Sequence, residues 1–300
     1  MFSLSTSWNS YKYAKGSDII KEIKSIGFDT VELNFSLTEN IVKDIVSLVD
    51  SKEIKVSSLH NICPLPKEVE PAHASPDYYS LASDDIGERG RAVDVTKNTI
   101  SYAKRLGARA VVLHIGRIEI KDRIGELASL IGEKDAFDKF REKMVKERED
   151  RKGRSIDNVI KSLEELVPFA KDSRIALGIE NRYYYREIPL PEELEILFKR
   201  FPDGSLYYWH DTGHAEVFER LGLGNHKDTL DRFSNRLLGI HLHDIIGSIH
   251  DHQAPGFGTF DFRILKPYLK ADTIKVIETH RPATPDVIRR SVEYLTKILG

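Results

Sequence analysis

Residues 110–115 read Ala-Val-Val-Leu-His-Ile, an apolar run interrupted only by His114. Such a run is typical of a strand that is buried on both faces, as the strands of parallel sheets are. Runs of similar length, bounded by turn-forming residues, recur along the chain. The eight predicted strands are 2–8, 30–35, 55–60, 110–115, 175–180, 206–211, 237–243 and 273–279. The sequence therefore predicts a largely parallel sheet of eight strands.

Between the predicted strands, apolar residues recur at helical spacing. The helices predicted from this spacing cover 18–26, 40–49, 85–106, 155–171, 191–200, 262–270 and 285–299. Eight strands that alternate with helices in one chain predict a closed (β/α)8 barrel, a TIM barrel of the α/β class. A doubly wound open sheet is the alternative, but the first strand–helix turn lacks a glycine-rich phosphate-binding pattern. No linker interrupts the series, so we expect residues 1–300 to form a single domain.

Two connections are long, namely residues 61–109 after the third strand and residues 116–174 after the fourth. The second contains a charged stretch, 133–154, in which both signs mix. Mixed charges are typical of a solvated helix rather than of a surface that binds nucleic acid. We therefore expect a barrel with insertions after strands 3 and 4. Such insertions can form lids or the contacts of a homo-oligomer.

The composition excludes several classes of protein. The 300 residues are 40% hydrophobic and carry 45 Lys and Arg against 47 Asp and Glu, a net charge of −2. This gives material for a large core but no basic field that would attract nucleic acid or an anionic membrane. The chain start lacks the pattern of a signal peptide, and no apolar run approaches the roughly 20 residues of a membrane span, so we expect a cytoplasmic protein. The single cysteine, Cys63, cannot form an internal disulfide.

Histidines and carboxylates gather where six successive predicted strands end. In a parallel barrel these ends and the loops after them form one mouth, where active sites lie. The polar residues there are His60, Asn61, His114, Glu180, Asn181, Arg182, His210, Asp211, His214, His241, His243, Asp244, His250, Asp251, His252, Glu278 and His280. Unpaired charges in such a site cost several kcal/mol each, which a bound cation would offset. Mixed imidazole and carboxylate ligands favour Zn²⁺, Mn²⁺, Co²⁺ or Fe²⁺. The sequence predicts a divalent metal site and leaves the number of ions open.

Short motifs at these strand ends resemble the xylose isomerase-like barrel superfamily. They are Ile179-Glu180-Asn181, Asp211-Thr212-Gly213-His214, His241-Leu242-His243-Asp244 with Pro255-Gly256-Phe257-Gly258, and Ile277-Glu278. That superfamily contains sugar and sugar phosphate isomerases and epimerases, inosose dehydratases and endonuclease IV. The resemblance implies a metal held by Glu180, Asp211, His241 and Glu278. His241 is preferred to His243 because the family motif reads His-Leu-x-Asp, with the ligand first.

The resemblance also implies a reaction. Glu180 and Glu278 would remove and return a proton on a sugar, sugar phosphate or related polyol, through a metal-stabilised enediolate. Epimerisation, aldose–ketose isomerisation and dehydration all begin with this proton abstraction, so the choice among them stays open. We expect a small carbohydrate-like substrate, with contacts from Trp8, Arg182 and His243.

Endonuclease IV, which cleaves phosphodiesters at abasic sites with three zinc ions, is the rival interpretation. His60, His114, His214 and His252 match its additional ligands, but His250 stands where that family has an aspartate. These five histidines are therefore candidates for a second metal or for substrate binding. The neutral charge balance and the absence of a basic stripe speak against DNA as the substrate. A non-catalytic metal or sugar binder is the third alternative, although both candidate bases are present.

Overall fold

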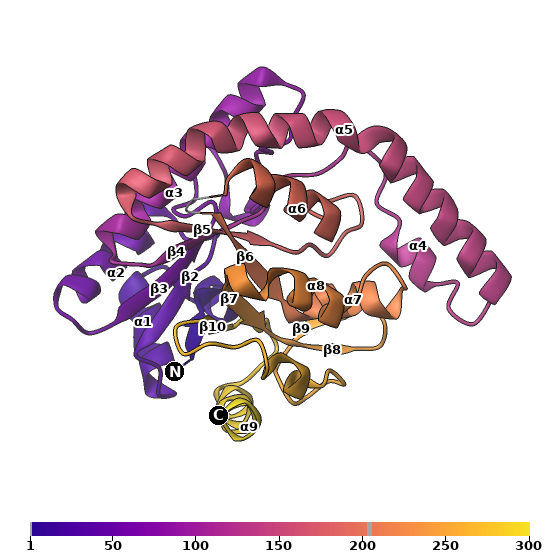
Figure 1. Ribbon diagram of the computed structural model, residues 1–300. Coiled ribbons are helices and arrows are strands. Elements are labelled where there is room, and N and C mark those ends of the chain that lie inside the picture. The colour runs from indigo at the N-terminus through magenta and orange to yellow at the C-terminus, as the bar shows by residue number, and fades with distance from the viewer. Residues whose placement is uncertain (1, 203–205) are drawn as a thin grey trace.

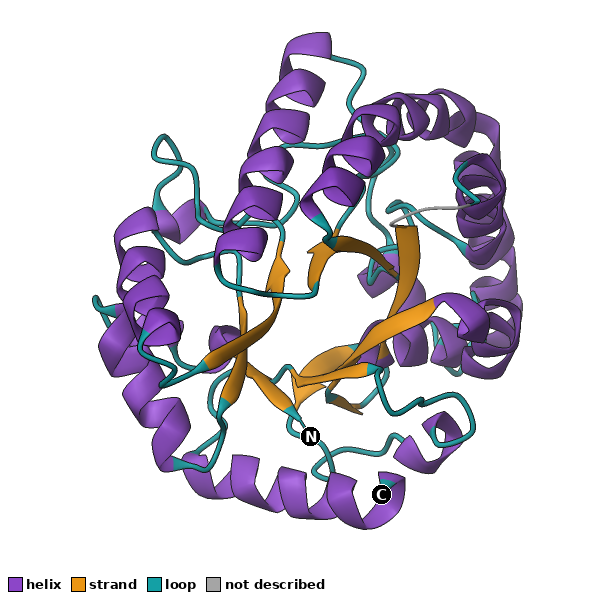
Figure 2. Ribbon diagram, turned by 60° about the vertical axis from the view of Figure 1, so that its left-hand side comes forward, coloured by secondary structure: helices purple, strands orange, loops and turns teal. Residues whose placement is uncertain are grey.

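The eight strands that line the centre of the molecule form a closed parallel barrel, which confirms the predicted fold (Figures 1 and 2). The computed structural model describes residues 2–202 and 206–300. The strands pair in the order β1-β10-β7-β6-β5-β4-β3-β2, and β2 pairs with β1 to close the ring. Their bounds are β1 (Ser3–Ser5), β2 (Thr30–Leu33), β3 (Lys55–His60), β4 (Ala110–Leu113), β5 (Ala176–Glu180), β6 (Leu206–Asp211), β7 (Leu237–Leu242) and β10 (Ile274–Ile277).

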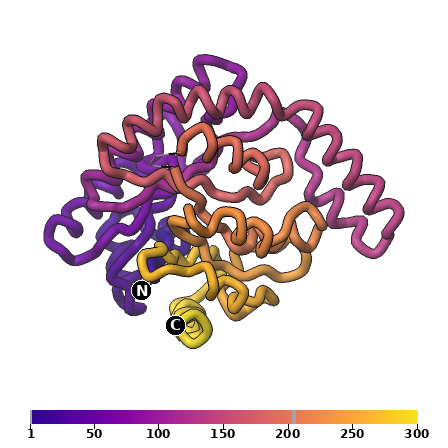
Figure 3. The backbone as a smooth tube through the Cα atoms, in the orientation of Figure 1, coloured from indigo at the N-terminus to yellow at the C-terminus, as the bar shows by residue number. Residues whose placement is uncertain are grey.

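Helices surround the barrel, and most of them lie where the apolar spacing predicts them (Figure 2). Their bounds are α1 (Gly16–Ser25), α2 (Glu39–Asp50), α3 (Ile86–Arg105), α4 (Ile124–Ala128), α5 (Lys134–Ser173), α6 (Pro191–Arg200), α7 (Thr212–Arg220), α8 (His226–Phe233) and α9 (Pro285–Leu299). The charged stretch 133–154 and the predicted helix 155–171 belong to one continuous helix, α5. The first half of α5 extends past the barrel beside α4 (Figure 3). No helix in the described part of the chain is long and apolar enough to cross a membrane.

Three local predictions are wrong. The predicted helix 262–270 is a short 3-10 helix, Phe262–Leu265, because Pro267 lacks the N–H that a helix interior needs. The first strand ends at Ser5, and Thr6–Trp8 forms a 3-10 turn. Helices α4, α7 and α8 are absent from the prediction, and α7 begins without a loop directly after β6.

The connection after β7 also differs from the prediction, which has no strand there. Strands β8 (Asp244–Ile246) and β9 (His250–Gln253) form an antiparallel hairpin next to the barrel mouth. This hairpin carries two of the histidines that the sequence places at the site.

Trp209 fills the barrel interior beneath the mouth. Its side chain is completely buried, and a Cβ atom on Gly239 would overlap its ring, while one on Gly178 would lie 2.9 Å from it. The two glycines on the neighbouring strands therefore make room for the indole. The His241 ring rests on Trp209 with 5.1 Å between centroids. The packed interior thus forms a floor that supports the site.

Candidate active site

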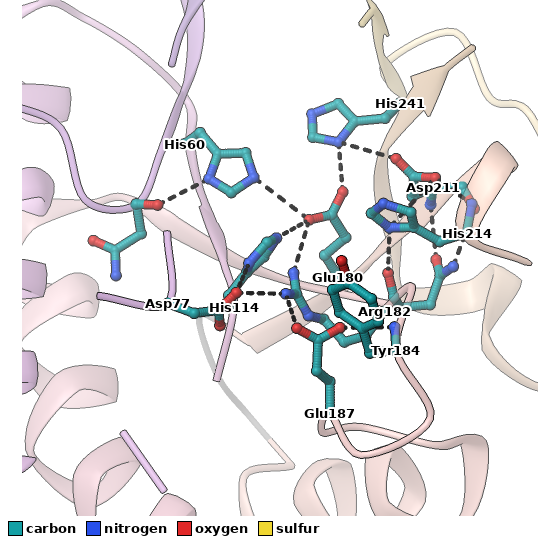
Figure 4. A network of polar contacts seen from close by, with 12 residues as sticks. His60, Asp77, His114, Glu180, Arg182, Tyr184, Glu187, Asp211, His214 and His241 are labelled. Carbon is teal, nitrogen blue, oxygen red and sulfur yellow. Dashed lines mark hydrogen bonds and ion pairs between the residues drawn. The ribbon is translucent and has the colours of Figure 1, made fainter. Parts of the chain in front are cut away.

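Four side chains converge at the mouth from the ends of four neighbouring strands. Glu180 ends β5, Asp211 ends β6, His241 lies near the end of β7, and Glu278 follows β10. Each offers one ligand atom within 4.8 Å of the others. His241 Nδ1 lies 2.6 Å from Glu180 Oε1 and 3.7 Å from Asp211 Oδ2 (Figure 4). The same nitrogen lies 3.0 Å from Glu278 Oε2. The structure therefore brings together the four residues that the sequence proposes as metal ligands.

The other nitrogen of His241 contacts the carboxylate of Glu32, which belongs to β2. His241 Nε2 lies 2.9 Å from Glu32 Oε1, and Ser58 donates a hydrogen bond of 2.7 Å to Glu32 Oε2. The carboxylate of Glu32 favours the tautomer of His241 that carries its proton on Nε2, so the lone pair of Nδ1 faces the site. Burial lowers the pKa of His241, but Glu278, Glu32 and Glu180 outweigh burial and raise this pKa well above its ordinary value.

The donor set fits a divalent cation. Three carboxylates and one imidazole nitrogen face one point, and all four residues are buried. Buried carboxylates of like charge need a compensating positive charge. One nitrogen and three oxygen donors suit Zn²⁺, Mn²⁺, Co²⁺ or Fe²⁺.

A second group shares Glu180 with the first. His114 Nε2 lies 2.7 Å and His60 Nε2 lies 3.5 Å from Glu180 Oε2. The remaining nitrogens are engaged elsewhere, since His60 Nδ1 lies 2.9 Å from the carbonyl of Asn61 and His114 Nδ1 lies 2.9 Å from Asp77 Oδ2 (Figure 4). Both imidazoles are thus oriented with Nε2 toward Glu180. Asp77, which comes from the insertion after β3, was not predicted.

A third group lies on the hairpin side of the mouth. Asp251 Oδ2 lies 3.0 Å from His252 Nδ1 and 3.6 Å from His214 Nε2. His252 has a φ of 54°, a left-handed conformation that interrupts the alternation of a strand, and Asp251 and His252 both line the cavity. Asp251 therefore supplies the carboxylate that the sequence analysis found missing at position 250. His250 is exposed and belongs to none of the groups of candidate ligands among the described residues.

Two predicted substrate contacts lie away from the cavity. Both nitrogens of His243 contact protein groups, because Nε2 lies 2.8 Å from Asp211 Oδ2 and Nδ1 accepts a 2.9 Å hydrogen bond from the amide of His252. His243 therefore contacts Asp211, and it also belongs to the third group of candidate ligands together with His214, Asp251 and His252. The indole of Trp8 is completely buried and donates a 2.8 Å hydrogen bond to the carbonyl of Ala283, so it exposes no face on which a sugar could stack.

A cavity of about 360 Å³ opens above these groups. Glu180 and Glu278 line it, together with Arg182, the third predicted substrate contact. Arg182 Nη2 lies 2.7 Å from Asp77 Oδ2 and 2.8 Å from Glu187 Oε1, so two carboxylates already balance its charge.

Aromatic and imidazole rings complete the wall of the cavity. Phe35 and Tyr183 line it, and the ring of His280 stacks on His252 with 3.9 Å between centroids. Burial, followed by the charge of His252, lowers the pKa of His280 to about 3.

Comparison with known proteins identifies the family. The family model described as xylose isomerase-like TIM barrel matches residues 20–298. The uncharacterized protein y4fM of Sinorhizobium fredii is 26% identical over 255 residues, which are 80% of this chain and 72% of that protein. The structure of a D-tagatose 3-epimerase-like protein has 21% identity and a TM-score of 0.68, and covers 99% of this chain and 96% of its own. The complex of D-allulose 3-epimerase from Methylomonas sp. with D-allulose has 13% identity and a TM-score of 0.70, with the same coverage. The chain belongs to the xylose isomerase-like TIM barrel family.

Proposed function

We propose that this protein is a metal-dependent isomerase or epimerase of a sugar, sugar phosphate or related polyol. The observation that carries the proposal is the convergence of Glu180, Asp211, His241 and Glu278 beneath a cavity of about 360 Å³. Sugar epimerases among the structural neighbours support the same class of reaction. The proposal includes a small carbohydrate substrate, a single catalytic domain and a cytoplasmic location.

Two carboxylates are available to transfer a proton. A divalent ion held by the four residues would supply Lewis acidity toward a substrate carbonyl. Burial alone would raise the pKa of Glu180 and of Glu278, but His241 in particular outweighs burial and holds both pKa values well below the usual range. Both carboxylates are therefore ionised at neutral pH and can accept a proton.

The positions of the two carboxylates allow opposite faces of a substrate to be reached. Glu180 comes from β5 and Glu278 from the end of β10, and these strands flank β6 and β7 in the barrel. For a substrate bound between them, one carboxylate removes a proton and the other delivers one to the opposite face, which inverts the carbon. Return of the proton to the adjacent carbon gives isomerisation instead.

Exchange of solvent deuterium into ketoses and ketose phosphates tests the proposal. NMR should show deuterium at the carbon next to the carbonyl only with metal-loaded protein, and Glu180→Gln and Glu278→Gln should abolish it. Tyr207→Phe serves as a matched control, since the hydroxyl of Tyr207 has no hydrogen bond within the described residues. Loss of water from a polyol substrate, followed by mass spectrometry, would assign a dehydratase instead. Absence of both reactions with metal-loaded protein would refute the proposal.

A metal-dependent phosphodiesterase acting on abasic DNA is the second candidate. It is favoured by the two additional groups of candidate ligands, which are His60, His114 and Glu180 on one side and His214, His243, Asp251 and His252 on the other. The net charge of −2 disfavours a polyanionic substrate. Metal-dependent nicking of abasic duplex DNA, without carbon–proton exchange on any sugar, would establish this candidate in place of the first.

A further inference from the structure

A hydrogen-bonded series of buried polar side chains lies outside the cavity, on the face of β6 opposite Trp209 and Asp211. The hydroxyl of Tyr208 lies 2.6 Å from His210 Nδ1, and His210 Nε2 lies 3.1 Å from His226 Nδ1, at the start of α8. His226 Nε2 lies 3.2 Å from Glu216 Oε2, which belongs to α7. Tyr208 and His210 are completely buried, and His226 is 1% exposed. None of these residues takes part in the proton transfer proposed above.

The donor and acceptor of each hydrogen bond in this series can be assigned. The Tyr208 hydroxyl donates its single proton to Asn181 Oδ1 at 3.1 Å, so His210 Nδ1 must donate to the Tyr208 oxygen. In an imidazole with one ring proton, one nitrogen donates and the other accepts. His210 Nε2 therefore accepts a hydrogen bond from His226 Nδ1. At the far end of this series, His226 Nε2 lies 3.2 Å from Glu216 Oε2.

At the near end of this series lies the side-chain amide of Asn181, which binds both the backbone N–H and the backbone carbonyl of Asp211. Asn181 Oδ1 accepts a 2.7 Å hydrogen bond from the amide of Asp211, and Asn181 Nδ2 donates a 3.0 Å bond to the Asp211 carbonyl. The hydroxyl of Tyr208 can donate only to an oxygen, so it holds the side chain of Asn181 with Oδ1 toward Tyr208. This is the orientation in which Asn181 forms both hydrogen bonds to Asp211. The carbonyl of Asn181 also lies 3.1 Å from His214 Nδ1, which leaves His214 Nε2 facing the site (Figure 4).

We propose that Tyr208, His210 and His226 are positioning residues, which hold Asn181 and through it set the geometry of Asp211. This inference rests on the proposed function, in which Asp211 is a metal ligand. If these side chains only filled space, their polar atoms would be dispensable, and an apolar replacement of similar shape would leave Asp211 unchanged.

The test compares three variants of the full-length chain with Tyr207→Phe as the matched control. Tyr208→Phe removes one oxygen from the chain, and His210→Phe removes both ring nitrogens. His210→Asn keeps an amide donor near the position of Nδ1.

Affinity for Zn²⁺ and Mn²⁺ is measured on metal-depleted protein by competition with a chromophoric chelator. Partners of metal ligands typically contribute 10- to 100-fold to affinity, so we expect about a tenfold loss for Tyr208→Phe and a larger loss for His210→Phe. His210→Asn should remain within about threefold of the parent chain, and Tyr207→Phe should match it.

Amide exchange of Asp211 in the metal-free protein provides a second readout that does not depend on metal. Because the Asp211 amide is bound to Asn181, Tyr208→Phe and His210→Phe should accelerate its exchange, while amides of β4 exchange as before. If the parent chain binds no metal, the proposed function fails, and faster exchange at Asp211 still supports the positioning role. Unchanged exchange at Asp211 in both variants overturns the inference. So does an affinity loss that His210→Asn shares in full with His210→Phe.

Discussion

Replacement of Arg148 by methionine should destabilise the barrel more than any comparable change on α5. The guanidinium is completely buried and forms an ion pair with Glu193, with Nη2 2.8 Å from Glu193 Oε2. It also donates to two backbone carbonyls of the loop after β5, those of Tyr185 at 2.6 Å and Glu187 at 2.8 Å. Methionine keeps the length of the side chain but leaves the Glu193 carboxylate buried without its partner.

The magnitude follows from the burial of the pair. Removal of one partner of a buried ion pair costs about 3 to 5 kcal/mol. For 300 residues, an unfolding entropy of about 2.1 cal/mol/K per residue gives about 0.6 kcal/mol per degree. The midpoint of thermal unfolding should therefore fall by about 5 to 8 °C. A second substitution, Glu193→Leu, should restore roughly half of the loss because no buried charge is then unpaired.

Thermal and urea unfolding followed by circular dichroism measure the effect. Lys146→Met is the matched control, because Lys146 lies on the same helix and pairs with Asp150 at 2.7 Å on the surface. Exposed pairs contribute about 0 to 1 kcal/mol, so this variant should unfold close to the parent chain. If Arg148→Met unfolds within about 1 kcal/mol of the parent, or Glu193→Leu deepens its loss, the reasoning from burial is wrong.

Three further predictions concern the site and its floor. Removal of metal with a chelator should lower the free energy of unfolding by about 2.7 kcal/mol relative to protein at 100 times the dissociation constant, and an unchanged midpoint would contradict metal binding. Glu32→Gln should weaken metal binding 10- to 100-fold in a chelator competition, because the amide no longer fixes the proton on His241 Nε2. An unchanged affinity would show that Glu32 does not support His241 as a metal ligand. Gly239→Ala should lower stability by about 1 to 3 kcal/mol in urea unfolding, since its Cβ would overlap Trp209. A neutral effect would mean that the barrel interior is not close-packed there.

The sequence predicts the barrel and the main ligand group for one physical reason. Strands buried on both faces are recognisable as apolar runs, and a parallel barrel places all their carboxyl ends at one mouth. Glu180, Asp211 and Glu278 end such runs, so their proximity follows from topology. The choice between His241 and His243 came from the family motif, and in the structure it is His241 Nδ1 that faces the three carboxylates.

Features set by single backbone torsions or by loop folding could not be predicted. The sequence places Asp251 at the mouth, but no local pattern predicts the left-handed conformation of His252 beside it. Asp77 lies in the insertion after β3, where neither the periodicity of apolar residues nor the spacing of a motif predicts its position. Helix α7 was missed because Asp211 serves twice, as the last residue of β6 and as the N-cap that accepts a 2.8 Å hydrogen bond from the amide of His214.

Anomalous scattering from crystals grown with Zn²⁺ or Mn²⁺ is the decisive measurement for the metal site, because it locates the ions and identifies their ligands together. We expect one strong peak within bonding distance of Glu180, Asp211, His241 and Glu278, with His241 coordinating through Nδ1. Further peaks beside His60 and His214 would favour the phosphodiesterase. No peak among the four residues, at a metal concentration that saturates the protein in solution, would contradict the account.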